Sequence, residues 1–194
     1  MIKIIITILM SLFFFGCTHN PYPYIDIIDK ITERKASQIC REEKLKVVAT
    51  GGAMMDSITR FTICFASYGK ELDLAEARRL YVKCMEGLRN EINSHEELKP
   101  FLNPNPFPVD GMDIGFMIFD KQGHFMRFGC AFLGKGGISA ISQHYGTIFY
   151  DSYNPRTEKL ESFYEEPYEV ALAIVRGETR TKNRMFCCFE IALE

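Results

Sequence analysis

The stretch ITRFTICFASYG (residues 58–69) is followed almost at once by DLAEARRLYVKCMEGLRNEIN (residues 73–93). The first is rich in aromatic and β-branched residues and ends at a glycine, which predicts a long strand. The second begins with Asp73, a good N-cap, and has Glu76 three residues on, which predicts a capping box. Its apolar residues recur at three- and four-residue steps, at Leu74, Ala77, Tyr81, Cys84, Leu88 and Ile92. This spacing indicates a long amphipathic helix packed on a sheet.

Further elements are expected on both sides of this pair. Near-helical apolar spacing predicts an amphipathic helix over residues 25–43, and LKVVAT (residues 45–50) is typical of a strand. Pro167 and Gly177 bracket a short third helix, because proline favours the first helical position and glycine the C-terminal end. The strands expected after the long helix cover residues 112–120, 124–134, 147–153 and 184–193, the first two forming a β-hairpin.

The order of these elements predicts the fold class. Hairpins without regular βαβ alternation favour an α+β domain over residues 25–194, with an antiparallel-dominated sheet of about five to six strands and one long and two shorter helices. The stretch KPFLNPNPFPVDG (residues 99–111) holds four prolines, so it is expected to be an ordered loop. The glycine-rich stretch at residues 134–146 is expected to connect two strands as a loop.

The N-terminus predicts export from the cytoplasm. Lys3 gives a basic start, an apolar run follows, and Gly16 supplies the small residue that precedes a cleavage point. Residues 1–16 therefore have the pattern of a signal peptide, and the run is too short for a spanning helix. An uncleaved anchor and a buried N-terminal helix are the alternatives.

The apolar run stops at Cys17, in SLFFFGCTHNPYP (residues 11–23). A cysteine directly after the cleavage point resembles the lipobox of bacterial lipoproteins, although Phe14 and Phe15 replace its usual leucine and small residue. The resemblance implies that the Cys17 thiol is diacylated and anchors the protein in the membrane. Residues 17–24 hold two prolines and are expected to form a tether. Thr18, in place of an aspartate, favours the outer membrane, with the domain facing the periplasm.

The composition excludes some partners and limits the membrane contact. The formal net charge is −2, and removal of Lys3 with the signal would make it −3. Such a balance argues against nucleic-acid binding, which requires a basic surface. It also argues against electrostatic adhesion to anionic lipid, so the membrane contact is expected from the acyl chains. Sixteen phenylalanines and no tryptophan predict a phenylalanine-filled core.

Six cysteines remain when Cys17 is set aside. They are Cys40, Cys64, Cys84, Cys130, Cys187 and Cys188. An oxidising compartment permits disulfides, and six cysteines allow 15 pairings among which the sequence does not choose. However, most of them lie in apolar strand-like runs or on the apolar stripe of a helix, which favours buried free thiols. No CxxC pair is present, so neither a zinc knuckle nor a thioredoxin-like site is supported.

The C-terminal third is rich in aromatic residues that could form a binding cleft. The candidates for binding a sugar or a peptide are Tyr145, Tyr150, Tyr153 and Tyr164, with Phe149, Phe163 and Tyr168 nearby. This interpretation requires several of these rings to share one exposed face. The alternative is that they belong to the core and to ordinary strand surface.

Signals for catalysis are weaker. Cys130 and His144 could form a thiol–imidazole pair, with Asp151 or Asp120 to orient the imidazole, provided that the thiol is exposed and within reach of its base. The neighbours of Cys130 in FGCAFL predict burial instead. The histidines and aspartates lack metal-type spacing such as HExxH, and neither a metal nor a cofactor is expected. Glu165, Glu166 and Glu169 near a helix start are expected to stabilise the positive end of its dipole.

The segment ELDLAEARRLYVKCMEGLRNEINSHEELKPFLNPNPF (residues 71–107) and the IGFMIFDKQG that follows it resemble a small uncharacterised family of bacterial lipoproteins. The resemblance covers less than a third of the chain and implies no activity. The expected function is that of a membrane-anchored envelope lipoprotein, acting as a binding or structural module for an envelope protein or glycan. The alternative is an envelope hydrolase with a Cys/His or His/Asp site.

Overall fold

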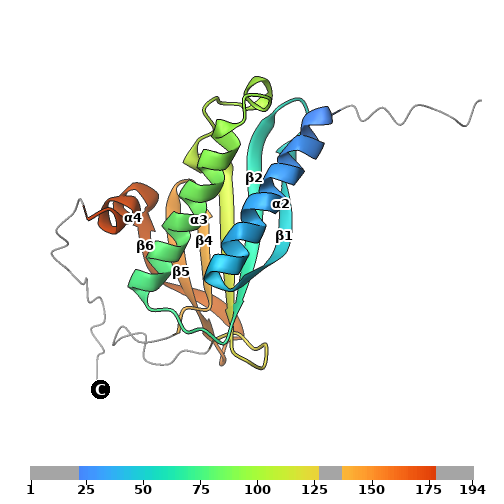
Figure 1. The fold of residues 1–194 in the computed structure, drawn as a ribbon. Coiled ribbons are helices and arrows are strands. Elements are labelled where there is room, and N and C mark those ends of the chain that lie inside the picture. The colour runs from blue at the N-terminus through green and yellow to red at the C-terminus, as the bar shows by residue number, and fades with distance from the viewer. Residues whose placement is uncertain (1–21, 127–136, 178–194) are drawn as a thin grey trace, which may run out of the picture.

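The computed structural model describes residues 22–126 and 137–177 of the chain. Within these ranges it contains three α-helices and one six-stranded sheet (Figure 1). The helices are α2 (Pro23–Glu43), α3 (Leu74–Ser94) and α4 (Tyr168–Val175). The strands are β1 (Leu45–Met54), β2 (Ile58–Tyr68), β3 (Met112–Phe119), β4 (Ala140–His144), β5 (Thr147–Asn154) and β6 (Lys159–Pro167). The predicted α+β class is therefore confirmed.

The strands of the sheet lie in sequence order from β1 to β6. All neighbouring pairs are antiparallel except β2 and β3, which run parallel. This exception follows from α3, because parallel strands need a crossover long enough to return the chain to the same end of the sheet. The sheet is therefore antiparallel-dominated, as predicted.

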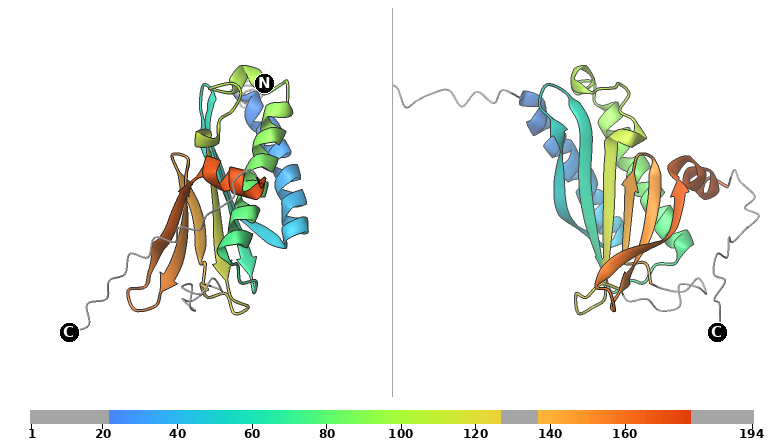
Figure 2. Two further views of the ribbon diagram at one scale, coloured as in Figure 1. Left: turned by 90° about the vertical axis from the view of Figure 1, so that its left-hand side faces the viewer. Right: turned by 180° about the vertical axis from the view of Figure 1, so that it is seen from behind.

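Helices α2 and α3 lie side by side against the same face of the sheet (Figure 1). The view from behind shows the opposite face of the strands, with both long helices lying beyond the sheet (Figure 2). We call this second surface the open face. No helix among the described residues covers it.

The core lies between the sheet and the two long helices. Strand β3 alternates strictly between buried and half-buried residues, as expected for a strand with one face on the core. Phe65 of β2 and Phe116 of β3 stack at its centre, with ring centroids 5.3 Å apart. In the proline-rich loop, Leu102 and Phe107 are buried and anchor the chain between α3 and β3.

The start and the buried face of α3 confirm the prediction for residues 73–93. The Glu76 backbone N–H donates to Asp73 Oδ1 at 2.7 Å, and the Asp73 N–H donates to Glu76 Oε2 at 3.2 Å. This reciprocal pair is a capping box, which satisfies two backbone donors that the helix leaves unpaired. Five of the six predicted stripe residues are buried, and Leu74 packs against the core at its edge.

The expectation of one long and two shorter helices was wrong, since α2 and α3 both have 21 residues. Helix α2 begins at Pro23, two residues before the predicted start, because proline suits the first helical position. Tyr24 is 3% exposed, and its hydroxyl donates to the backbone carbonyls of Met54 and Met55. These contacts fix the first turn of α2 to the end of β1.

The sequence analysis missed two strands, and it misplaced the start of α4 as well as that of α2. Strand β4 lies in the stretch expected to be a loop, because pairing with β3 and β5 outweighs its glycine-rich flanks. Strand β6 lies at the sheet edge, where seven consecutive residues from Lys159 are exposed, so it lacks an apolar alternation. Pro167 is the N-cap of α4 rather than its first helical residue.

Two predicted elements fall wholly or partly outside the described residues. Of the hairpin strand at residues 124–134, the structure describes Phe125, which forms a β-bridge with Phe119. The strand expected at residues 184–193 lies outside the described ranges. Among the helices that are described, none has the length and apolar character required to cross a membrane.

Candidate functional site

The four tyrosines predicted to form a cleft lie in different surroundings. Tyr145 is in the turn between β4 and β5 and is 86% exposed, whereas Tyr150 is fully buried beneath the helices. Tyr164 lies opposite Tyr150 on β6, with ring centroids 5.8 Å apart. Tyr153 is on the open face, three residues along β5 from Tyr150. The structure thus brings Tyr150 and Tyr164 together but separates them from the other two.

Tyr150 belongs to a buried polar cluster that also includes Arg78 and Glu166. The Tyr150 hydroxyl donates to Glu166 Oε1 at 2.7 Å, and Arg78 Nε donates to the same oxygen at 2.7 Å. Burial, and then the neighbouring carboxylate, raise the pKa of Tyr150 well above its usual value. The Tyr150 hydroxyl stays protonated and already donates its hydrogen bond to a carboxylate, so it is not available as a reactive group. The cluster therefore acts in stabilising the fold.

A row of stacked aromatic rings crosses one end of the open face. The ring of Tyr68 on β2 stacks on Phe119 of β3 at 5.2 Å between centroids. Phe119 lies 4.8 Å from Phe125, which lies 5.6 Å from Tyr153 of β5. The interplanar angles are 21°, 30° and 24°, so each ring is tilted by at most 30° from its neighbour. We call Tyr68, Phe119, Phe125 and Tyr153 the aromatic row.

The aromatic row is partly open to solvent. Tyr68 is 48% exposed, and the other three rings are half-buried. Lys46 of β1 closes the row at one end, since its Nζ lies 5.2 Å from the centroid of the Tyr68 ring in a cation–π arrangement. An apolar surface of this kind, bordered by charged residues, is typical of an interaction site.

The row depends on strand pairing rather than on sequence neighbours. The parallel register places Tyr68 opposite Phe119, and the hairpin bridge places Phe125 beside Phe119. Among the tyrosines predicted to bind, Tyr153 belongs to the row, whereas the other three row members were not predicted. The two-residue period of each strand predicts on which face of the strand each ring lies. Only the register between strands shows that the rings are neighbours.

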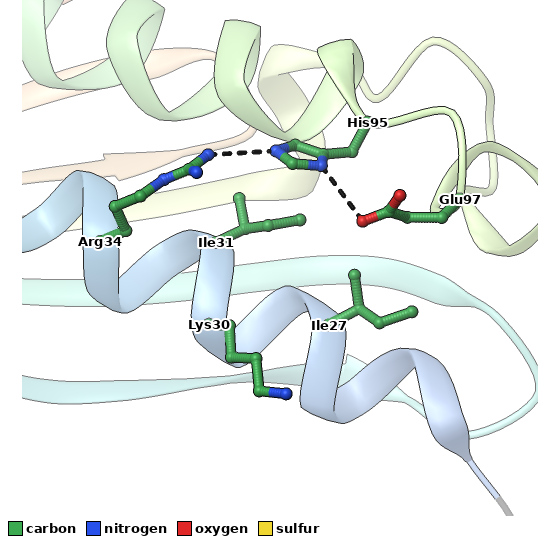
Figure 3. Close-up of a pocket in the computed structure, with 6 residues that line it drawn as sticks. All are labelled: Ile27, Lys30, Ile31, Arg34, His95 and Glu97. Carbon is green, nitrogen blue, oxygen red and sulfur yellow. Dashed lines mark hydrogen bonds and ion pairs between the residues drawn. The ribbon is translucent and has the colours of Figure 1, made fainter.

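A pocket of about 390 Å³ lies between the first half of α2 and the chain that follows α3 (Figure 3). Its lining residues are Ile27, Lys30, Ile31, Arg34, His95 and Glu97. Two isoleucines from α2 form an apolar floor, and charged side chains form the rim. Of these residues, the sequence analysis considered His95 only as one of the histidines that lack metal-type spacing.

The rim of this pocket is a chain of hydrogen bonds. Arg34 is paired with Glu91, and its Nη2 lies 3.3 Å from His95 Nε2. His95 Nδ1 lies 3.3 Å from Glu97 Oε1. Glu91 Oε1 lies 3.6 Å from the same His95 Nε2 atom, so Arg34, Glu91, His95 and Glu97 form one connected polar cluster. The side chains of Arg34, His95 and Glu97 on the rim thus satisfy one another.

The chemistry of the pocket is that of a polar helix junction. None of the six lining residues is a serine, threonine or cysteine, so the lining itself offers no nucleophile of the usual hydroxyl or thiol kind. Its charges are committed to one another across α2 and the end of α3. The aromatic row, whose ring edges and exposed tyrosine have no comparable partner network, is the stronger candidate for binding.

The structure describes only part of the Cys/His site considered for a hydrolase. Cys130 lies outside the described residues. His144 is exposed at the end of β4 with its ring 5.9 Å from Phe149, whereas Asp151 pairs with Ala140 at the other end of that strand. Asp120 accepts the backbone N–H groups of Gln122 and His124 and shapes the hairpin turn. Among the described residues, no hydrogen bond joins His144 to either aspartate.

Metal ligands do not gather in the described part of the chain, where no group of three or more histidine, cysteine, aspartate or glutamate residues could hold an ion. Asp113 instead pairs with Arg60. Glu166, which was expected to act on the helix dipole, is 3% exposed and bonded to Arg78.

The three described cysteines, Cys40, Cys64 and Cys84, are free thiols. Cys84 is fully buried on α3, and the other two are half-buried. Burial raises the pKa of all three thiols, so they remain protonated and weakly nucleophilic at neutral pH. Cys84 therefore agrees with the expectation that these cysteines are buried free thiols.

Comparison with known proteins identifies no relative, since no family model, no curated protein and no solved structure matches the chain.

Proposed function

We propose that this protein is an envelope lipoprotein, anchored through acylated Cys17, whose α+β domain binds an envelope partner on its open face. The observation that carries the proposal is the aromatic row, because partly exposed aromatic rings from four separate segments gather on a sheet face that no described helix covers. Aromatic residues are enriched in the central contacts of protein interfaces.

The position of the tether supports an outward-facing orientation for this surface. Helix α2 begins at Pro23, six residues after Cys17, and a segment of that length reaches at most about 20 Å. The first turn of α2 lies at one end of the sheet, and the hairpin that carries Phe125 lies at the other (Figure 1). In the proposed arrangement the aromatic row is thus at the end far from the membrane.

The polar clusters favour binding over catalysis. Arg78, Tyr150 and Glu166 satisfy one another in the interior, and Arg34, His95 and Glu97 do so at the pocket rim. A catalytic site needs a nucleophile or a base that is accessible and poised. Neither cluster leaves such a group available to a substrate.

Membrane fractionation of expressing cells tests the anchor. We expect the wild-type protein in the outer-membrane fraction and the Cys17→Ser variant in the soluble periplasmic or cytoplasmic fraction. Cys40→Ser serves as the matched control, because it removes a half-buried thiol from the folded domain. If Cys17→Ser stays in the membrane fraction as fully as the wild type does, acylation of Cys17 is not the anchor and the proposal fails.

A further inference from the structure

We infer that the partner of the aromatic row is an extended polypeptide segment that carries alternating apolar side chains and an acidic end directed toward Lys46. The inference rests on the proposed function, since it names the ligand of the same open face. It follows from the ring orientation, the length of the row and the charges at its two ends.

The ring orientation favours aliphatic side chains over sugars. The electron-rich face of an aromatic ring is the part that attracts cations and polarised C–H groups. In the row these faces are turned toward neighbouring rings, with centroids 4.8 to 5.6 Å apart, and the outer face of Tyr68 is turned toward Lys46. A sugar therefore finds no free platform between the rings, whereas apolar side chains can pack along the ring edges.

The length of the row matches a short extended peptide. The three successive centroid spacings give the row a length of at most about 16 Å. Alternate side chains on one face of a strand are about 7 Å apart. Three such side chains cover about 14 Å. A peptide of five to seven residues with every second residue apolar therefore fits the row from Tyr68 to Tyr153.

The charges at the two ends of the row give the peptide a direction. Lys46 lies over Tyr68, Lys121 packs against Gly69, and Lys70 is exposed next to that glycine. Of the acidic groups at this end, Asp120 is held by the hairpin turn and paired with His124, and Glu71 is exposed beside Lys70. The three lysines outnumber these two carboxylates, so this end is basic.

The other end carries an acidic group, Asp151, which shares the open face two residues from Tyr153. Glu161 pairs with Ser152 and therefore lies on the opposite face of the sheet. Complementary potentials select the orientation of a ligand, so an acidic group of the peptide is expected beside Lys46 and repelled from Asp151.

Fluorescence anisotropy with three labelled heptapeptides tests the inference on the mature protein reconstituted in a nanodisc. The first peptide, EELSLSL, has the predicted alternation and an acidic end. The second, KKLSLSL, reverses the charge, and the third, EELLLSS, keeps the composition of the first but loses the alternation. We expect the first to bind at least tenfold more tightly than either of the others.

Two variants locate the site. Lys46→Glu is expected to abolish the preference for EELSLSL over KKLSLSL, and Phe125→Ser is expected to weaken EELSLSL binding at least tenfold. Val170→Ser, on the exposed side of α4, is the control and is expected to leave binding unchanged. Circular dichroism of each variant verifies that the fold is intact.

Several outcomes would overturn the inference. These are equal binding of the three peptides, binding of none, or a charge preference that Lys46→Glu leaves intact. Binding that occurs only after truncation at Gly177 would assign the row to the C-terminal segment of this chain. A dimer that Phe125→Ser dissociates would assign it to a second copy. Each of these results leaves acylation of Cys17 untouched, so failure here is distinguishable from failure of the anchor.

Discussion

Arg78 of α3 and Glu166 of β6 form a buried two-point ion pair, with Nε–Oε1 and Nη2–Oε2 distances of 2.7 Å and 3.0 Å. Their side chains are 11% and 2% exposed. Helix α3 follows β2 in the sequence, yet this pair joins it to β6, the edge strand at the far side of the sheet. The pair is therefore the polar contact that fixes β6, and with it Tyr164, to the helical layer.

Breaking this pair at one end should destabilise the protein strongly. Glu166→Gln leaves the Arg78 guanidinium buried without its counter-charge, and removal of one partner from a buried pair costs about 3 kcal/mol or more. The double variant Arg78→Met/Glu166→Gln should recover much of that loss, because no buried charge remains. Urea unfolding of the four proteins in the cycle measures both effects.

An exposed ion pair provides the matched control for this cycle. Arg34 and Glu91 also join two helices, but the Arg34 side chain is 67% exposed. Solvent screens such a pair, so Arg34→Met should change the free energy of unfolding by less than about 1 kcal/mol. If Arg34→Met and Glu166→Gln lower the free energy of unfolding by equal amounts, the role assigned to Glu166 is contradicted.

The turn between β4 and β5 should be stabilised by replacing its tyrosine. Tyr145 and Gly146 have φ values of 49° and 77°, which makes the two-residue turn type I′, where asparagine followed by glycine is preferred. A left-handed conformation costs most residues about 1 kcal/mol or more. Tyr145→Asn should thus raise the free energy of unfolding by about 1 kcal/mol, measured by urea denaturation.

The second turn position should respond in the opposite direction. Gly146→Ala introduces a Cβ into a left-handed conformation and places it 2.9 Å from Asp110 Oδ1. It should lower the free energy of unfolding by about 1 kcal/mol or more. If Tyr145→Asn is destabilising while Gly146→Ala is neutral, the type I′ assignment is wrong.

Asp151 should make stability depend on pH. Burial on the open face raises the pKa of this carboxyl, and a hydrogen bond with Ser162 opposes the rise only in part. A raised folded-state pKa means that folding disfavours the charged form, so Asp151 reduces stability as pH rises from the unfolded value of 3.8 through the folded value. Asp151→Asn should therefore be more stable than the wild type at pH 7.

The same variant should lose its advantage in acid. Below pH 3.8 the wild-type carboxyl is largely protonated in the folded and the unfolded protein, so the difference in unfolding free energy shrinks there. Urea titrations at pH 3.5 and pH 7 provide the measurement. A wild-type protein that exceeds Asp151→Asn in stability at pH 7 would show that the Ser162 contact outweighs burial.

Alkylation should distinguish the described cysteines. Cys84 is fully buried and its pKa is raised by burial, so iodoacetamide should leave it unmodified in the native protein. Cys40 is half-buried and should react first. Unfolding in urea should make the two thiols react at the same rate. Peptide mapping by mass spectrometry gives both rates. Native labelling of Cys84 as fast as that of Cys40 would contradict the packing of α3.

The sequence predicted the elements whose local signals agree with their packing. Helix α3 combines a capping box at Asp73 with a periodic apolar stripe, and the structure buries that stripe. Strand β6 carries no such signal, because it lies at the sheet edge with most of its side chains in solvent. Strand β4 is short and follows glycines, so only its partners make it a strand.

The candidate site was harder to predict than the fold. The aromatic candidates Tyr145, Tyr150, Tyr153 and Tyr164 were close in sequence, yet strand alternation sends Tyr150 and Tyr153 to opposite faces of β5. The rings that meet Tyr153 come from distant segments through the parallel register of β2 and β3. Parallel pairing is set by the α3 crossover, which single-segment patterns do not reveal.

Mass spectrometry of the mature N-terminus tests the central claim most directly. The protein is purified from membranes and digested, and its N-terminal peptide is fragmented to locate any modification. The account predicts that the chain begins at Cys17, with diacylglycerol on the thiol. An N-terminus at Met1, or an unmodified Cys17 in membrane-associated protein, would contradict it.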